Sequence, residues 1–323
     1  MEHIHSLAEI KLERPSIVTI GAFDGVHRGH QYLIEQQVQL ARQRDAAAVV
    51  LTFFPHPDRV LRAPQGPYYL TTPDERAALI GSLGVDLVVT LPFDDALRHT
   101  RAADFVKLLI DRLNLHALWV GPDFALGYRR EGDVPFLKAL GERLGFAVRV
   151  VDVQQTRDGE AISSTAIREA LRKGEVERAA RYLGRPYRIT GTVVEGRRRG
   201  QKLGFPTANL QVWHERMIPA AGVYAGWAWV GDRRYATAAN IGVRPTFQDD
   251  ASQSIEAHLL DYDGGDLYGW EIALEFVGRL RGEQRFESVE ALRAQIAKDV
   301  TQTRALLGVA APTRPGFSGR SAE

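Results

Sequence analysis

The sequence predicts an α/β protein with two domains: an N-terminal doubly wound parallel sheet and a C-terminal small antiparallel β-barrel with a packed helix. From residue 17 to about residue 151, short apolar runs alternate with helical patterns, which is typical of a parallel sheet. After residue 184, short β-type runs follow one another with glycines between them, which favours a barrel. At 323 residues the chain is long enough to bury two cores.

In the first domain, buried strands are expected where apolar residues form short runs, at 17–20, 47–53, 87–91, 115–120 and 146–151. Helical patterns lie between them, at 31–44, 72–83 and 103–113. The helix at 72–83 has a clear start, because Thr72 can cap it, Pro73 suits its first position and Glu75 completes a capping box. Ligands of such sheets bind beyond the carboxyl ends of the strands, so the loops that follow these strands are the candidate site.

In the second domain, strands are expected at 187–194, 222–230, 234–241, 254–260 and 271–280, and a last helix at 288–302 would pack on the barrel. Gly184, followed by Pro186, ends a helical stretch at 171–182 and marks the boundary. The small, polar C-terminal residues are typical of a loose tail. We therefore expect domains at 1–183 and 184–308 and a flexible tail at 309–323.

The composition excludes several classes of protein. The chain is 45% hydrophobic and 25% charged with a net charge of +1, which argues against a general nucleic-acid or membrane-surface binder. It has no cysteine, so disulfides, thiolate metal sites and cysteine nucleophiles are excluded. No apolar run reaches the ~18 residues of a membrane span, and the N-terminus does not resemble a signal peptide. We expect a cytoplasmic protein acting on small molecules, with no nucleic-acid or membrane partner. The sequence leaves its oligomeric state open.

A glycine-rich turn follows the first long strand and reads Gly21-Ala22-Phe23-Asp24-Gly25-Val26-His27-Arg28-Gly29-His30. A strand that runs through such a turn into a helix N-terminus makes an anion site, because free backbone N–H groups and the helix dipole point at one spot. The three glycines let a phosphate approach the backbone. His27 and His30 add side-chain donors. A surface turn with two solvated histidines is the structural alternative, but strand, glycines and helix all agree with the anion site.

Three more stretches follow predicted strands or precede a helix: Phe54-Pro55-His56-Pro57, Gly121-Pro122-Asp123-Phe124, and Ile162-Ser163-Ser164-Thr165-Ala166-Ile167-Arg168. In the first, two prolines predict an extended loop, and its aromatic ring could stack on a planar ligand. In the last, Arg168 would project a guanidinium fork suited to a phosphate. Each also has a structural interpretation. The first could be a rigid turn with buried rings, and the hydroxyls of the last could merely cap a helix.

Together these stretches resemble, in order and position, the His-x-Gly-His signature and companion motifs of the FMN adenylyltransferases in the nucleotidyltransferase superfamily. The resemblance implies a Rossmann-like nucleotidyltransferase domain in which His27 and His30 are catalytic and stabilise the leaving pyrophosphate. It implies nucleotide-binding roles for Gly21, Phe23, Asp24, Gly25, Gly29, Asp123, Ser163, Ser164, Thr165 and Arg168. It implies flavin-binding roles for Phe54, Pro55, His56 and Pro57. Ala125-Leu126 departs from the family, which has a larger polar residue and a phenylalanine there.

The barrel region carries a second set of motifs. A loop with glycines and basic residues, Arg197–Lys202, could fold over a triphosphate. The segment Gly204-Phe205-Pro206-Thr207-Ala208-Asn209 follows it and resembles the Pro-Thr-Ala-Asn motif of riboflavin kinases. This resemblance implies that Thr207 and Asn209 hold Mg²⁺ and the ATP phosphates, since oxygen ligands suit a hard cation. It also implies nucleotide contacts from Gly200, Lys202 and Gly204.

Further blocks of the same kinase family resemble Gly222–Tyr224, Asn240–Thr246 and Glu256–Leu260, in the same order. Glu256 matches the position of the family's general base, which takes a proton from the 5′-hydroxyl of the ribityl chain as it attacks the γ-phosphate. An exposed strand glutamate is the structural alternative. Arg281 and Glu283 fall in the segment that covers the flavin in the family.

The resemblance extends from residue 15 to about residue 305 and implies a bifunctional riboflavin kinase/FMN adenylyltransferase. Such an enzyme uses ATP as co-substrate, Mg²⁺ as cofactor, and riboflavin, FMN and FAD as substrates or products. Two hypotheses of other classes stay open. One is a kinase whose N-terminal half only binds nucleotide or flavin, and the other is a non-catalytic flavin-binding regulator.

Overall fold

The computed structural model describes residues 1–151, 161–196, 204–244 and 252–310. The chain divides into two compact units by its contacts. The first, here called the sheet unit, comprises Met1–Arg168, Tyr182–Gly184 and Glu215–Met217. The second, the barrel unit, comprises Glu169–Arg181, Arg185–His214 and Ile218–Glu323. The predicted basic loop Arg197–Lys202, with Gly200, and the tail from residue 311 onward lie outside the described residues.

The sheet unit is built on six parallel strands in the order β1-β4-β3-β2-β5-β8. They are β1 (Glu2–Ile4), β2 (Ser16–Ile20), β3 (Ala47–Phe54), β4 (Leu87–Pro92), β5 (Leu115–Val120) and β8 (Ala147–Val150). Five of them match predicted strands. The strand β1 was not predicted, because three residues at a sheet edge are too few to show a period. A small hairpin of β6 (Ala125–Leu126) and β7 (Gly132–Asp133) follows β5.

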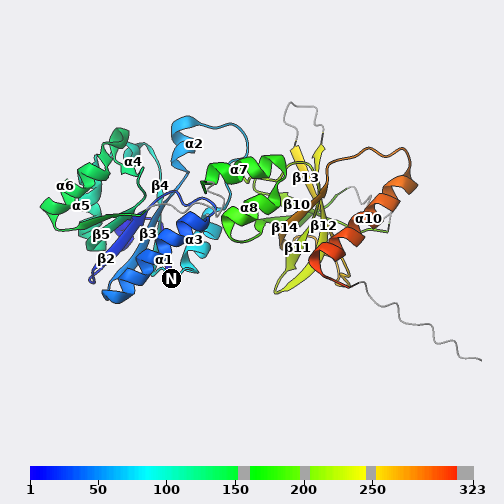
Figure 1. Cartoon of the computed structure of the whole chain (residues 1–323), viewed down its shortest axis with the longest axis horizontal. Helices are drawn as coiled ribbons and strands as arrows, with labels where there is room; N and C mark the ends of the chain where they lie inside the picture. The colour runs from blue at the N-terminus through cyan, green and yellow to red at the C-terminus, as the bar shows by residue number, and fades with distance from the viewer. Residues whose placement is uncertain (152–160, 197–203, 245–251, 311–323) are drawn as a thin grey trace, which may run out of the picture. The chain divides into compact units, whose positions relative to one another are not determined.

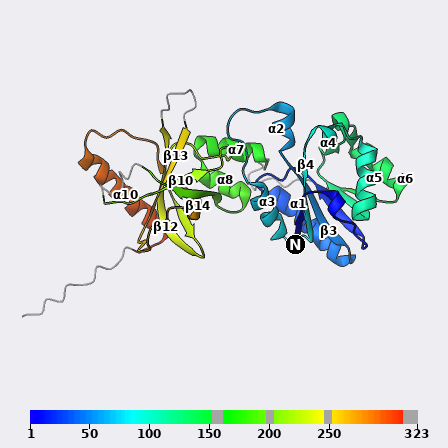
Figure 2. The same cartoon turned by 180° about the vertical axis from the view of Figure 1, so that it is seen from behind.

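Helices cover both faces of this sheet, as can be followed in Figures 1 and 2. Helices α1 (Arg28–Gln43) and α3 (Pro73–Gly81) pack on the face that carries Val50, and α5 (Ala102–Leu113) and α6 (Val134–Leu144) pack on the face that carries Val49. Neighbouring valines of one strand serve opposite layers because strand side chains alternate. The predicted capping box is confirmed, since Glu75 N–H donates to Thr72 Oγ1 at 3.2 Å and Thr72 N–H donates to Glu75 Oε2 at 2.9 Å.

The strand order identifies where a ligand would bind. From β2 the chain adds β3 and β4 on one side, and later β5 and β8 on the other. The order therefore reverses at β2, next to β5, which is the switch point where doubly wound sheets bind their ligands. Because all these strands are parallel, the loops after β2, β3 and β5 meet at one edge of the sheet.

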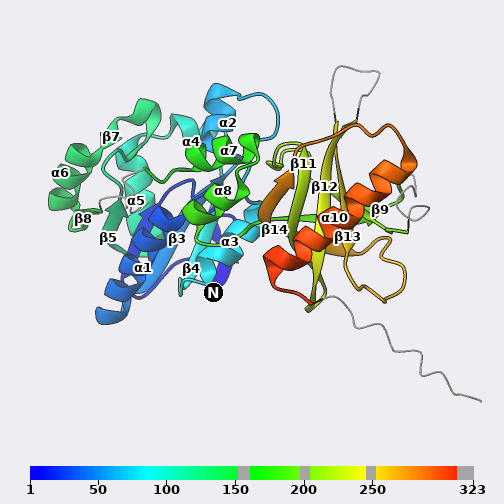
Figure 3. The ribbon, with the colours of Figure 1, turned by 45° about the vertical axis from the view of Figure 1, so that its right-hand side comes forward.

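The barrel unit is a closed antiparallel barrel in the order β10-β13-β12-β11-β14-β9. Its strands are β9 (Tyr187–Val194), β10 (Ala208–Val212), β11 (Gly222–Val230), β12 (Arg233–Arg244), β13 (Ser252–Leu259) and β14 (Glu271–Arg281). Five match predictions, and β10, part of the expected kinase motif, was missed. Figure 3 shows α10 (Val289–Leu307) lying across the barrel, where Val300 and Leu307 pack against Ala236 and Ala238.

The helical stretch predicted at 171–182 is two helices, α7 (Ser164–Lys173) and α8 (Val176–Leu183). Gly174 separates them with a φ of +76°, a conformation that glycine adopts without strain. Arg279 of β14 donates to the Lys173 carbonyl at 3.1 Å, and its own N–H donates to Glu177 Oε1 at 3.0 Å. Through such contacts residues 169–181 belong to the barrel unit. Short helices α2 (Pro57–Arg62) and α4 (Asp95–His99) complete the sheet unit. Within the described ranges, no helix has both the length and the apolar character needed to cross a membrane.

Candidate active sites

The glycine-rich turn after β2 is held in a fixed, unusual conformation. Phe23 and Val26 have φ of 48° and 41°, values that non-glycine residues adopt only at some energetic cost. Gly25, with φ of 82°, donates its N–H to Thr71 Oγ1 at 3.2 Å. A Cβ at Gly21 would lie 2.9 Å from the Phe23 ring, so glycine is required for that ring to fold over the turn. Strained backbone of this kind is characteristic of ligand sites.

His27 and His30 stand at the start of α1. His27 Nδ1 accepts a hydrogen bond from His30 N–H at 3.3 Å and caps the helix, so α1 begins at Arg28, earlier than expected. The two imidazole rings stack, with centroids 3.5 Å apart and planes 20° from parallel. Burial, and then the proximity of His27, hold the pKa of His30 well below its usual value. Its Nδ1 is buried and has no hydrogen-bond partner among the described residues. A neutral His30 ring therefore stacks on His27 at a helix N-terminus, where Gly29 is also buried.

Asp24 is fully buried beneath this turn and serves as its central acceptor. Its carboxylate accepts from Leu70 N–H at 3.0 Å and from the N–H and hydroxyl of Thr71, each at 3.1 Å. It lies 2.5 Å from Arg168 Nη2. Burial alone would raise the pKa of Asp24, but Arg168, Arg76 and the Leu70 N–H hold this pKa below its ordinary value. Asp24 is therefore ionised at neutral pH.

The Ser-Ser-Thr-x-x-Arg stretch reaches the same turn from far along the chain. Ser164 Oγ donates to the Asp24 carbonyl at 2.8 Å. Arg168 Nε donates to the Tyr68 carbonyl at 2.7 Å, and its guanidinium lies 3.9 Å from the centroid of the Tyr68 ring. Ser163 Oγ accepts from Ala166 N–H at 3.1 Å and thus caps α7. Helix capping was the structural interpretation of these hydroxyls. Thr165 is exposed. The tertiary fold therefore brings two motifs 140 residues apart to one place.

The Phe-Pro-His-Pro stretch is an extended loop only at Pro55 and His56, where the His56 backbone is extended. Phe54 ends β3, the Phe54–Pro55 peptide bond is cis, and Pro57 is the first residue of α2. The loop prediction is wrong at Pro57, because His56 Nδ1 accepts from Asp58 N–H at 3.0 Å, and this cap together with Pro57 starts a helix. Burial, more than any charge, lowers the pKa of His56 to about 4, so its ring is neutral.

The third predicted stretch lies in the turn after β5, the strand beside β2. Asp123 is exposed there, and its carbonyl accepts from Arg130 Nη2 at 2.8 Å. The turn leads into the β6–β7 hairpin, so the departing Ala125-Leu126 pair forms a short strand. Its position at the carboxyl end of β5 places it on the edge of the sheet that carries the histidine turn.

Arg76 of α3 was missed by the sequence analysis and belongs to this site. Its side chain is completely buried. Its Nη1 donates to the carbonyls of Ala22 and Phe53, each at 3.0 Å, and its Nη2 lies 4.0 Å from Asp24 Oδ1. The sequence did contain a sign of its burial, because Arg76 lies one helical turn before Ile80, on the apolar side of an amphipathic helix.

In the barrel unit, the strand register gathers the expected kinase residues. Asn209 of β10 is the cross-strand partner of Glu256 of β13, and Glu256 is in turn the partner of Asn240 of β12. Directly opposed residues of neighbouring strands point to the same face of a sheet. The predicted general base therefore stands between two amides, one of them a predicted metal ligand.

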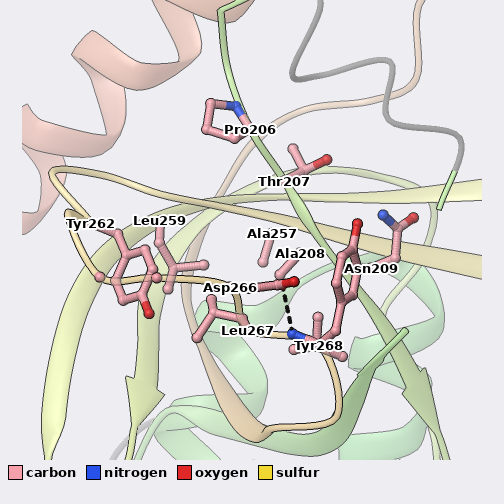
Figure 4. Close-up of a pocket in the computed structure, with 13 residues that line it drawn as sticks. Pro206, Thr207, Ala208, Asn209, Ala257, Leu259, Tyr262, Asp266, Leu267 and Tyr268 are labelled. Carbon is pink, nitrogen blue, oxygen red and sulfur yellow. Dashed lines mark hydrogen bonds between the residues drawn. The ribbon is translucent and has the colours of Figure 1, made fainter. Parts of the chain in front are cut away.

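A pocket of about 450 Å³, shown in Figure 4, has Asn209 in its lining but neither Glu256 nor Asn240. Thr207 and Asn209 line it, together with Val193, Pro206, Ala208, Ala257, Leu259, Tyr262, Gly264, Gly265, Asp266, Leu267 and Tyr268. The wall at 262–268 was missed, although its paired glycines and its tyrosines were visible in the sequence. The Asp266 carboxylate accepts from Tyr268 N–H at 3.0 Å, which fixes the curve of this wall (Figure 4). The pocket therefore has aromatic rings from Tyr262 and Tyr268 and side-chain oxygens from Thr207 and Asn209.

One hydrogen bond and two glycines position the Pro-Thr-Ala-Asn segment. His258 Nδ1 hydrogen-bonds the Pro206 carbonyl at 2.8 Å, and burial lowers the pKa of His258. A Cβ at Gly196 would lie 2.1 Å from Asn209 Nδ2, so this glycine leaves room for the amide. Gly204, with φ of 85°, turns the chain into the segment. The Thr207 hydroxyl and Asn209 amide oxygen in one pocket are the ligand types that Mg²⁺ takes, usually with substrate phosphates and water.

Arg281 and Glu283 have different surroundings. Arg281 pairs with the buried Asp299 of α10, with Nη2 2.8 Å from Oδ2, and so connects β14 to that helix. Glu283 is exposed, but a Cβ at Gly242 would lie 3.2 Å from its Oε1 and 3.2 Å from Ser254 Oγ. Its carboxylate thus reaches β12 near Asn240, on the strand that carries the partner of Glu256.

A histidine turn at the switch point of a doubly wound sheet, and a Pro-Thr-Ala-Asn segment beside a pocket on a barrel, are features of a two-unit transferase. Family models agree, since that of the FAD synthetases matches residues 9–166 and that of the riboflavin kinases matches residues 183–307. The chain belongs to the family of bifunctional riboflavin kinases/FMN adenylyltransferases.

Individual relatives support this membership. A bifunctional riboflavin kinase/FMN adenylyltransferase of Pseudomonas fluorescens is 40% identical over 95% of this chain and 98% of that protein. One of Escherichia coli K12 is 37% identical over 96% of this chain and 98% of that protein. A solved structure described as a macrolide-efflux protein from Streptococcus pneumoniae matches with a TM-score of 0.85 and 30% identity, over 94% of this chain and 98% of the other. The last likeness concerns the fold.

Proposed function

We propose that the two sites described above carry out the two reactions of this family. The chain is a riboflavin kinase and an FMN adenylyltransferase, with the kinase in its C-terminal part and the adenylyltransferase in its N-terminal part. One observation carries the assignment of the first site: Ser164 and Arg168 both bind Asp24 in the histidine turn. We assign residues 1–183 to the adenylyltransferase and 184–308 to the kinase, which the spans of the two family models support.

In the first site, the FMN phosphate attacks the α-phosphorus of ATP, a new P–O bond forms, and the bond to the β-phosphate breaks to release pyrophosphate. The reaction needs no covalent enzyme intermediate, so positioning and fixed charge supply the catalysis. His27 and His30 hold phosphate oxygens at the N-terminus of α1, where the dipole favours negative charge. The buried Nδ1 of His30 has hydrogen-bonding capacity left for such a contact.

The Ser-Ser-Thr-x-x-Arg stretch would complete this first site from the other side. Ser163, Ser164 and Thr165 begin α7, and Arg168 supplies charge beside Asp24. The flavin would lie toward Phe54–Pro57, at the end of β3, and Asp123, after β5 on the other side of β2, would contact the nucleotide. Gly21, Gly25 and Gly29 give the phosphates access to the backbone between them.

In the second site, Glu256 takes the proton of the riboflavin 5′-hydroxyl as that oxygen attacks the γ-phosphorus of ATP, and ADP leaves. Thr207 and Asn209 would hold Mg²⁺, which neutralises charge on the phosphates when bound. The register places the Asn209 amide beside the Glu256 carboxylate, so the metal site and the base adjoin. Gly200, Lys202 and Gly204 would cover the triphosphate, and Arg281 and Glu283 would flank the flavin.

A time course with purified protein, riboflavin, ATP and Mg²⁺, followed by chromatography, tests the assignment. FMN should accumulate first and FAD should follow. The His27→Ala, His30→Ala double variant should still form FMN but no FAD, whereas Glu256→Gln should form FAD only when FMN is supplied. FAD formation at the wild-type rate by the double variant would refute the first site. FMN as the sole product of the wild type would leave the N-terminal half as a binding site. No turnover with flavin still bound would favour a regulator.

A further inference from the structure

Arg76 is the largest fully buried side chain, and only part of its hydrogen-bonding capacity is satisfied. Its Nη1 donates to the carbonyls of Ala22, which follows β2, and of Phe53, the last residue but one of β3, and lies 3.3 Å from Thr52 Oγ1. Its Nε and Nη2 are buried and make no hydrogen bond within the described part of the chain. A buried guanidinium with open donors is costly to keep, so a structural role alone explains it poorly.

The charges around Arg76 do not cancel. Asp24 carries one negative charge, while Arg76 and Arg168 each carry one positive charge, and all three side chains are buried. His56, whose pKa is affected by all three of these groups and by Asp58, is neutral because burial lowers its pKa to about 4. The buried set of Asp24, Arg76 and Arg168 therefore carries a net charge of +1 next to the turn that contains His27 and His30. Burying such a charge is unfavourable unless an anion sits close to it.

We propose that Arg76 is a positioning residue of the FMN adenylyltransferase site, which fixes the ends of β2 and β3 and supplies the uncompensated positive charge behind the histidine turn. The inference rests on the proposed function of the first site. Its first part follows from the two contacts of Nη1, because they join the Ala22 carbonyl after β2 to the Phe53 carbonyl in β3. Its second part follows from the charge count, since buried charge acts on bound phosphates with little screening.

A measurable consequence concerns His30. The groups that set its pKa are burial, the neighbouring His27, Arg76 and His56. Arg76 lowers the pKa of His30 because a nearby positive charge disfavours the protonated ring. Removal of the guanidinium charge should therefore raise the pKa of His30 toward its usual value, even in protein without substrate.

The test uses the full chain with Arg76→Met, which removes the charge, and Arg76→Lys, which keeps the charge but not the fork. Arg216→Met is the matched control, because Arg216 is also buried in the sheet unit but pairs with Glu75. For each variant, kcat and KM are measured for FMN adenylylation, with riboflavin phosphorylation by the same preparation as reference. The pKa of His30 is measured by NMR of ¹³C-labelled histidine, with His30→Gln to assign the signal.

For Arg76→Met we expect kcat of adenylylation to fall about ten- to a hundredfold and the pKa of His30 to rise, with riboflavin phosphorylation unchanged. Arg76→Lys should keep the low pKa of His30 and show an intermediate kcat. Arg216→Met should lower thermal stability without moving the His30 pKa. An Arg76→Met enzyme with wild-type kcat and His30 pKa would overturn the inference.

Two further results separate this inference from the function on which it rests. If Arg76→Met does not fold, Arg76→Gln replaces it, because glutamine keeps an N–H donor but has no charge; a wild-type kcat and a wild-type His30 pKa in that variant refute the inference. If the wild type itself makes no FAD from FMN and ATP, the proposed function of the first site fails, and the inference fails with it.

Discussion

Replacement of Asp24 by asparagine tests the centre of the sheet unit most directly. The side chain keeps its shape but loses its charge, so Arg168, 2.5 Å away, and Arg76, 4.0 Å away, lose their shared carboxylate. The new amide group would also turn a donor toward Leu70 N–H or Thr71 N–H, which both donate to Asp24 now. The variant therefore leaves the buried guanidinium groups of Arg76 and Arg168 without their carboxylate. It also places the amide N–H donors of the new side chain next to backbone N–H donors.

The magnitude follows from the burial of all three side chains. Removal of one partner from a buried ion pair costs about 3–5 kcal/mol, since the remaining charge stays in a poorly solvated place. In a domain of this size each kcal/mol lowers Tm by roughly 2–4 °C, so we expect Tm of the sheet unit to fall by on the order of 10 °C. Adenylylation should be lost at a temperature where riboflavin phosphorylation persists.

The pH dependence of the same variant checks the cause. The pKa of Asp24 is below its ordinary value in the folded chain, so its stabilisation is complete above the unfolded value of about 3.9 and is lost as the pH falls through the native pKa. Asparagine has no such titration. The difference in unfolding free energy between wild type and Asp24→Asn should therefore be constant from about pH 5 to pH 8 and shrink below about pH 4.

Urea denaturation followed by far-UV circular dichroism, together with thermal inactivation of each activity, measures these effects. Asp86→Asn is the matched control, because its carboxylate pairs at 2.8 Å with Arg42, whose side chain is 51% exposed. Such a pair contributes about 1 kcal/mol or less. The reasoning is refuted if Asp24→Asn is as stable as Asp86→Asn, or if both activities are inactivated together.

Three other predictions concern the barrel unit. Glu256→Gln should lower kcat of riboflavin phosphorylation about 10²- to 10⁴-fold and leave adenylylation of supplied FMN intact; a loss below about tenfold would exclude a general base. Asn209→Ala should raise the Mg²⁺ concentration for half-maximal kinase activity, and an unchanged Mg²⁺ titration curve would remove it from the metal site. Asp299→Asn should weaken the attachment of α10 to Arg281 and raise KM for riboflavin more than it lowers kcat; an equal change in both would indicate general destabilisation.

Much of the fold could be predicted because its signals are local. A strand such as β5 is a run of apolar residues, and the start of α3 is encoded in four consecutive residues, Thr72 to Glu75. Both domains could be assigned a fold class because the spacing between such elements is local too. The strand β1 was not predicted because its three residues are too few to show a period. The strand β10 was not predicted because its first two residues, Ala208 and Asn209, belong to the Pro-Thr-Ala-Asn motif.

The sequence by itself also determined which motifs belong to which reaction, because residue type and spacing along the chain carry that information. Only the tertiary structure decided what each side chain contacts. It placed Arg168 on Asp24, paired Arg281 with Asp299, and buried Arg76 behind the histidine turn. Such pairings join residues far apart in the chain, and their strength depends on burial, which one-dimensional spacing does not encode. The motifs alone thus predict the chemistry of this protein, whereas the buried charges that support it are defined only by the folded structure.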